Sequence, residues 1–123
     1  MFSIYQTDDG HELPFEYLPC AAITPKYGMA MKITGGKLAI ASGTDKPEYM
    51  CAREESAAVA AGTVIPAVKV GPDQRWRTRS DSSFTVGAAY TLSSTGLGIT
   101  TTTTGGVFTV DGVHDGMVYG RFL

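Results

Sequence analysis

The chain lacks three features that would point to a specific class of partner: a surplus of basic charge, a long apolar run and a leader-like start. Its formal net charge is −2 over 123 residues, whereas proteins dedicated to nucleic acid usually carry a basic surplus that neutralises phosphates. No stretch approaches the roughly 20 apolar residues of a membrane-spanning helix. Residues 1–17 have no basic start followed by an apolar run, as a signal peptide would. We therefore expect no nucleic-acid partner and no membrane partner.

Cysteine and histidine are also scarce, with two of each. In a chain without a secretory signal, Cys20 and Cys51 are expected to be reduced, buried, small hydrophobic side chains. A single disulfide between them is the alternative. Two cysteines and two distant histidines make no convincing metal site, and we expect no cofactor.

Glycine, threonine and short apolar runs are what the chain has in abundance. Hydrophobic residues make up 43% of it, 15 residues are glycine, and an unbroken threonine run fills residues 100–104. This hydrophobic content is enough for one domain with a real core. The many turn residues between short apolar runs predict an all-β fold.

One segment of the chain is echoed by a second. Residues 28–41, GMAMKITGGKLAIA, align without a gap with residues 87–100, GAAYTLSSTGLGIT. Glycine, alanine, leucine and isoleucine recur at matching positions, and each copy is typical of a strand, a turn and a second strand. Residues 34–37 are predicted to form a tight hairpin turn, because Gly35-Gly36 tolerates the positive φ of such turns.

Alternating apolar residues predict further strands at residues 48–53, 63–70, 74–79, 107–110 and 117–123, with turns at 71–72 and 111–112. Pro66 implies that its strand lies at an edge or carries a bulge. Residues 54–61, EESAAVAA, fit either two helical turns or a wide surface loop. The sum is eight to ten short antiparallel strands in a small barrel or sandwich.

Residues 1–18 are predicted to form an N-terminal arm, and residues 19–123 a single β domain built on the two similar hairpins. The arm is polar, contains Pro14 and is expected to be at most partly ordered when the protein is alone. Its apolar side chains are nevertheless too numerous for a linker, so they should contact a partner surface. The predicted partner-binding residues of the arm are Phe2, Ile4, Tyr5, Phe15 and Tyr17.

The strand at residues 74–79 places Arg75, Arg77 and Arg79 on one face and Trp76 on the other. Its arginines could grip phosphates while Trp76 stacks on a base. The net negative charge favours the other interpretation, in which Trp76 lies in the core and the arginines pair with Asp73, Asp81 or a partner protein. Three like charges in a row predict an acidic counter-surface on a partner, so the three arginines join the predicted partner-binding residues.

The candidates for catalysis are weaker. His11 lies near Asp9 and Glu12, and His114 lies near Asp111 and Asp115, but a general base also needs a nucleophile and an orienting group within reach. A solvated histidine in a turn is the ordinary finding. The glycine pairs at residues 35–36 and 105–106 are turns, because neither opens a helix after a strand as a phosphate-binding loop does. We expect no enzymatic activity.

Residues 22–53, AITPKYGMAMKITGGKLAIASGTDKPEYMCAR, resemble the head decoration proteins of tailed bacteriophages. The likeness consists of a Thr-Pro lead-in among small residues, a strand, a turn, a strand ending near a Gly-Thr-Asp loop, and a further strand. The alanine-rich stretch followed by the strand at residues 63–70 adds to the likeness. Residues 86–123 are similar in a looser way, with VGAAYTLSSTG as a strand and turn ahead of the closing strands.

The resemblance implies a structural protein on the capsid surface of a virion, made in the host cytoplasm, that cements the shell after expansion. It implies the major capsid protein as partner and self-association, often as a homotrimer. An N-terminal arm commonly contacts the shell in such proteins, which carries over to residues 2–18 as a region. Two alternatives remain open. One is a small β-barrel that binds carbohydrate or oligonucleotide through Trp76 and Arg77; the other is a hydrolase that uses His114 and Asp115.

Overall fold

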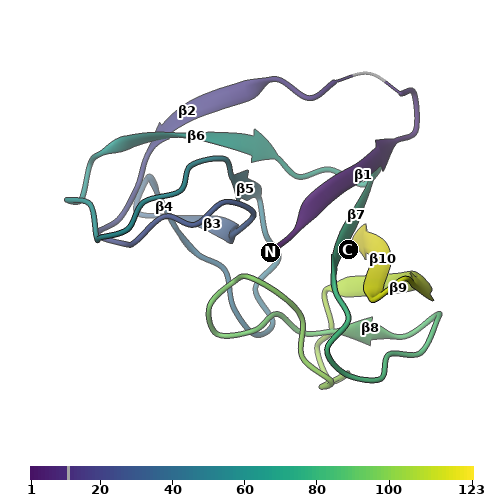
Figure 1. Ribbon diagram of the computed structural model, residues 1–123. Coiled ribbons are helices and arrows are strands. Elements are labelled where there is room, and N and C mark those ends of the chain that lie inside the picture. Colours follow the sequence, from purple (N-terminus) through teal and green to yellow (C-terminus); the bar gives the residue numbers. More distant parts are fainter. Residues whose placement is uncertain (11) are drawn as a thin grey trace.

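A computed structural model describes residues 1–10 and 12–123 of the chain, and these residues are all-β, without a helix. Ten strands form two five-stranded antiparallel sheets arranged as a small sandwich (Figure 1). The strands are β1 (Ser3–Thr7), β2 (Phe15–Pro19), β3 (Ala30–Thr34), β4 (Lys37–Ile40), β5 (Tyr49–Cys51), β6 (Val64–Lys69), β7 (Gln74–Arg79), β8 (Ala89–Tyr90), β9 (Phe108–His114) and β10 (Met117–Phe122). The predicted fold class is confirmed.

The second sheet contains the five consecutive strands β2–β6, whereas the first combines β1 with β7–β10. The first sheet has the order β1-β7-β10-β9-β8, and the second has the order β2-β6-β5-β3-β4. The chain passes between the sheets twice, through residues 8–14 and through residues 70–73. Both crossings join strands near the same side of the sandwich, where β1 and β2 form the outer edges (Figure 1).

The second sheet is buried on both of its faces at its centre. Met50 packs into the cluster between the sheets, whereas its neighbour Cys51 packs into a second cluster on the far face, as strand alternation requires. Residues 52–63 help to cover that far face: Val59 packs against the second cluster and its N–H donates to the carbonyl of Ile23 (2.8 Å). Residues 54–61 are thus a covering loop, the second of the two predicted alternatives.

The first hairpin forms as the sequence predicts, with Thr34 paired to Lys37 across Gly35 and Gly36, which have φ values of 58° and 78°. Its echo at residues 87–100 differs. Only Ala89–Tyr90 forms a strand there, and Leu92 meets Ile99 through a single bridge. The threonine run that follows is a loop, exposed from Thr101 to Thr104, and backbone hydrogen bonds join it to Thr91, just after β8.

Pro66 does not mark an edge or a bulge, which corrects that prediction. It lies in β6, between β2 and β5, in regular register opposite Tyr17. The carbonyl of Pro66 accepts a hydrogen bond from Ala52 (3.0 Å), just after β5 ends at Cys51. The N–H and C=O of one residue in an antiparallel ladder face the same neighbouring strand. The N–H that proline lacks would therefore point past the end of β5, so its absence breaks no bond within the β5–β6 ladder.

The turn predicted at Asp111-Gly112 is also wrong, because both residues lie inside β9. The chain turns instead at Asp115-Gly116, between the paired residues His114 and Met117, with Asp115 at a φ of 55°. Asp111 is the extra residue where the register between β9 and β10 shifts, which is the pattern of a β-bulge.

The N-terminal segment is built into both sheets, which corrects the expectation of an arm at most partly ordered, as far as its described residues are concerned. β1 pairs with β7 along one edge, and β2 pairs with β6 along the other. Phe2 is 1% exposed, and its N–H donates to the carbonyl of Gly28 (2.9 Å). Part of the segment's apolar surface is therefore buried within the chain's own sandwich.

We predict that Gly28→Ala destabilises the fold much more than Gly36→Ala. Both glycines have similar positive φ values, 77° and 78°, so each substitution carries a backbone cost of about 1–2 kcal/mol. At Gly28 the new Cβ would also overlap the carbonyl oxygen of Phe2, whereas nothing lies within 4 Å at Gly36. That overlap should add about 1–3 kcal/mol. Urea unfolding of the two variants measures the difference; equal losses would contradict the tight closure at Phe2.

Candidate partner-binding groove

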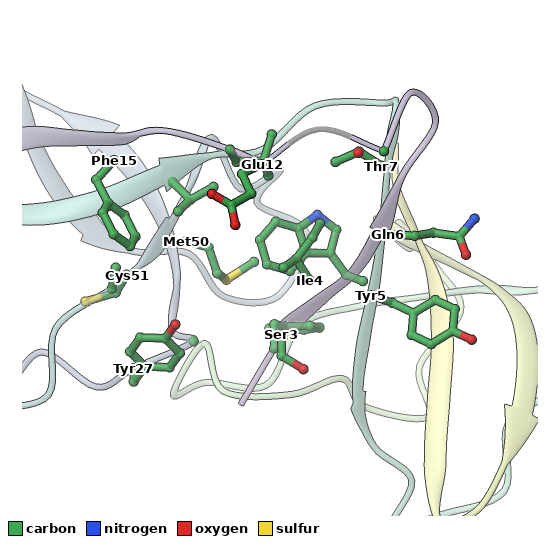
Figure 2. A pocket seen from close by; sticks show the side chains of 17 residues that line it. Ser3, Ile4, Tyr5, Gln6, Thr7, Glu12, Phe15, Tyr27, Met50 and Cys51 are labelled. Atoms are coloured by element: carbon green, nitrogen blue, oxygen red, sulfur yellow. The ribbon is translucent and has the colours of Figure 1, made fainter.

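A groove of about 600 Å³ separates β1 from the inner face of the second sheet. Met50, Val68 and Trp76 lie on its floor, while Ile4 and Phe15 come from the two edge strands. Figure 2 shows Ile4, Met50 and Phe15 around the same space, with Tyr27 below them. The groove is thus an apolar opening between the two sheets at the side where β1 and β2 are the edges.

Strand register explains why these side chains face the groove. Ile4 pairs with Trp76, and Phe15 pairs with Val68, so each pair shares the inner face of its sheet. The register of β1 shifts between Ile4 and Gln6, which leaves Tyr5 as the extra residue. Its ring consequently lies on the outer face of the first sheet, beside Tyr119 (Figure 2 shows Tyr5 directed away from the groove).

Apolar side chains remain exposed around the mouth of the groove. Phe15 is 56% exposed and Ile4 41%. Tyr17, two residues after Phe15 on the same face of β2, is 68% exposed, and Val64 on β6 adds to this surface. Contiguous apolar surface of this kind is typical of protein–protein interaction sites.

The groove is closed at one end and bridged at the other. The hydrogen bond from Phe2 to Gly28 joins the two sheets at the first end, next to Tyr27. The N–H of Tyr27 donates to the Glu54 carboxylate (3.0 Å), and this bond, followed by the one from Lys26, holds the pKa of Glu54 below its usual value. At the other end the chain crosses between the sheets through residues 8–14, part of which lines the groove.

Among the described residues, the charged lining of the groove is negative only. Glu12 is the single carboxylate among its described lining residues, and none of those residues is a lysine or an arginine. Figure 2 shows the Glu12 carboxylate directed into the space between Phe15 and Ile4. Within the described part of the chain, no hydrogen bond or ion pair joins Glu12 to another side chain. The arrangement favours an apolar occupant that carries a positive charge.

The opposite face of the first sheet carries the predicted arginines. Trp76 lies in the core, 3% exposed, with its indole N–H donated to Gln74 (3.1 Å), as the second interpretation of this strand expected. Arg75 pairs with Asp111, and its guanidinium lies 5.2 Å from the ring centres of both Tyr5 and Tyr119. The partner of Arg75 is therefore neither Asp73 nor Asp81.

Arg77 and Arg79 have no carboxylate within 4 Å among the described residues. The Nε of Arg77 donates to the Ser3 hydroxyl (3.2 Å), and its guanidinium lies 5.9 Å from the Tyr5 ring centre. A second ion pair on this face, Arg121 with Asp8, was not anticipated. Each ion pair reaches across an intervening strand of the first sheet, since β10 lies between β7 and β9 and β7 lies between β1 and β10. No local sequence pattern predicts that arrangement.

The histidines make no catalytic arrangement in the described residues. His114 is the last residue of β9, where its ring stacks on Tyr119 (4.4 Å between centres) and its Nδ1 meets the carboxylate of the adjacent Asp115 at 3.2 Å. No hydroxyl or thiol is hydrogen-bonded to it within the described part of the chain. His11, the other candidate, lies outside the described residues.

Cys20 and Cys51 are both free and buried, so the structure has the reduced pair rather than the disulfide. Burial raises the pKa of both thiols. Across residues 1–10 and 12–123, no cluster of three or more histidine, cysteine, aspartate or glutamate side chains could hold a metal ion. Nor does that part of the chain contain a helix long and apolar enough to cross a membrane.

The predicted partner-binding residues fall on two surfaces. Phe2, Ile4 and Phe15 line the groove, and Tyr17 extends its apolar rim along β2. The ring of Tyr5 lies instead on the outer face of the first sheet, beside Arg75 and Arg77. The arginines lie on the outer face of the first sheet, away from the groove. Sequence reasoning missed Tyr27, Met50 and Val68, which come from separate segments that only the tertiary fold brings together. A search with the sequence finds no matching protein-family model and no similar curated protein.

Proposed function

We propose that this protein is a structural decoration protein that binds the outer surface of a phage head and stabilises the shell, with the major capsid protein as partner. The observation that carries the proposal is the exposed apolar surface around the groove, to which both edge strands contribute. The resemblance of residues 22–53 to head decoration proteins supplies the identity of the partner.

The physics of such a role suits a small β sandwich. A protein that binds only the assembled shell stabilises that shell by mass action. Each contact can be weak, because the lattice repeats it and an oligomer engages several sites together. A groove on a rigid framework and a second, cationic face with Arg77 and Arg79 would give the protein two contact surfaces of different chemistry.

Binding of carbohydrate or oligonucleotide through Trp76 and Arg77 finds less support. Trp76 is 3% exposed in the core, so its ring faces are not free to stack on a sugar or a base. Arg77 lies on the other face of the same sheet, beside Ser3. The two residues therefore do not form one binding surface.

We predict that Ile4→Ser and Phe15→Ser each weaken binding to assembled phage heads by about tenfold, since each removes about 1–2 kcal/mol of apolar contact. Val86→Ser is the matched control: Val86 is 59% exposed but precedes β8, at the far edge of the first sheet from β1. Co-sedimentation of the folded variants with heads measures the affinities. Absence of binding by the unmodified protein would refute the proposed function, and equal losses in all three variants would refute the assignment of the groove.

We further predict self-association as a homotrimer, which would let one particle engage several lattice positions. Light scattering should then give three times the chain mass of 13.0 kDa. A mass equal to that of the single chain, unchanged up to the concentrations used for head binding, would contradict this part of the proposal.

A further inference from the structure

We infer that the groove takes an extended apolar segment of a partner chain, added as a strand beside β1, with one basic side chain directed at Glu12. The identity of that partner as a capsid protein rests on the proposed function. The chemistry of the segment rests on the groove alone.

The free edge of β1 provides the backbone partner for such a strand. β1 lies at the end of the first sheet and pairs only with β7. Phe2 donates its N–H away from β7, to Gly28 on the groove side. Alternate residues of a strand direct their backbone groups to the same side, so the N–H and C=O of Ile4 face the groove as well.

The register of β1 supports this direction. Farther along the chain, Asp8 donates its N–H to Asp73, on the β7 side. Without the bulge, alternation would give Phe2 and Asp8 the same direction. The extra residue between Ile4 and Gln6 shifts the alternation of backbone directions by one residue. Phe2 can therefore point toward the groove while Asp8 points toward β7. The backbone groups of Ile4 are therefore available to a strand in the groove, and the described part of the chain shows no loop hydrogen bond to them.

The floor of the groove selects the side chains of the segment. A strand added beside β1 would direct every second side chain toward the inner face of the second sheet. That face presents Phe15, Met50 and Val68, with Tyr27 at the closed end. β1 is five residues long, or about 17 Å, which matches a short segment with two or three apolar side chains facing inward.

The negative charge near the groove favours a basic side chain on the bound segment. Residues 8–16 contain four acidic residues and no lysine or arginine. Asp8 pairs with Arg121, and Glu16 accepts a hydrogen bond from Tyr49. Glu12 has no such partner in the described residues and its carboxylate enters the groove. A lysine or arginine on the segment would supply the missing positive charge.

The test uses the intact protein and the peptide acetyl-Val-Thr-Val-Lys-Val-Thr-Val-amide. Trp76 is the only tryptophan and lies on the groove floor, so its fluorescence reports occupancy. We expect saturable binding and a shift of the Ile4 amide signal in NMR spectra. Two peptides methylated at alternate backbone nitrogens distinguish strand pairing from nonspecific hydrophobic binding. The peptide that loses the N–H donors directed toward β1 should bind about tenfold more weakly, and the peptide methylated at the other nitrogens should bind normally.

Glu12→Gln tests the charge. This exposed substitution should weaken the lysine peptide about threefold and leave a peptide with norleucine in place of lysine unchanged. Val86→Ser should bind both peptides normally. Absence of saturable binding, equal binding by both methylated peptides, or equal occupancy by hexylammonium ion alone would each overturn the inference.

The peptide and head experiments fail independently. Peptide binding without head binding would leave strand addition standing and remove the capsid partner. Head binding that survives saturation of the groove with peptide would keep the proposed function and overturn the groove as its contact surface.

Discussion

The closure of the sandwich at Phe2 and Gly28 is the constraint on which the rest of the structure depends. The ring of Phe2 packs against Phe108 and Phe122, at 5.7 and 5.2 Å between centres, while its backbone N–H holds the loop before β3. One residue thus joins the aromatic core of the first sheet to the second sheet. Because Gly28 has no Cβ, the two backbones can approach closely enough for that bond to form.

The groove follows from this closure. The sheets are joined at Phe2, and farther along β1 the groove opens between them, bridged by residues 8–14. The same segment therefore completes both sheets and exposes apolar side chains at their edges. Natural proteins usually protect such edges with charge, bulges or covering loops. Here the bulge at Tyr5 and the carboxylates of Asp8, Glu12 and Glu16 provide partial protection, and Ile4 and Phe15 remain open to a partner.

Local patterns predicted the elements better than their partners. Gln74–Arg79 is a strand with the predicted bounds, and the Gly35-Gly36 hairpin has the predicted turn, because alternation and positive φ are properties of a few adjacent residues. The neighbour of a strand is not such a property. Pro66 predicts an edge or a bulge because proline lacks a backbone donor, and nothing local shows that β2 pairs beyond it. Asp111-Gly112 predicts a turn because Asp-Gly is a common turn pair, whereas here Asp111 is the extra residue of a bulge. For the site, the apolar residues of β1 and β2 were predictable, whereas Met50, Tyr27 and Val68 meet them only through the fold.

Hydrogen exchange of the backbone amides of residues 2–7 measures whether the N-terminal strand is an integral edge of the sandwich. The Phe2 amide, which donates to Gly28, should exchange as slowly as amides of the central strands, since it opens only with the whole fold. The Ile4 amide, which faces the groove, should exchange much faster. Exchange of Phe2 at the rate of an unfolded chain, in a protein whose β7 and β10 amides are protected, would show that the N-terminal strand is not part of the sandwich.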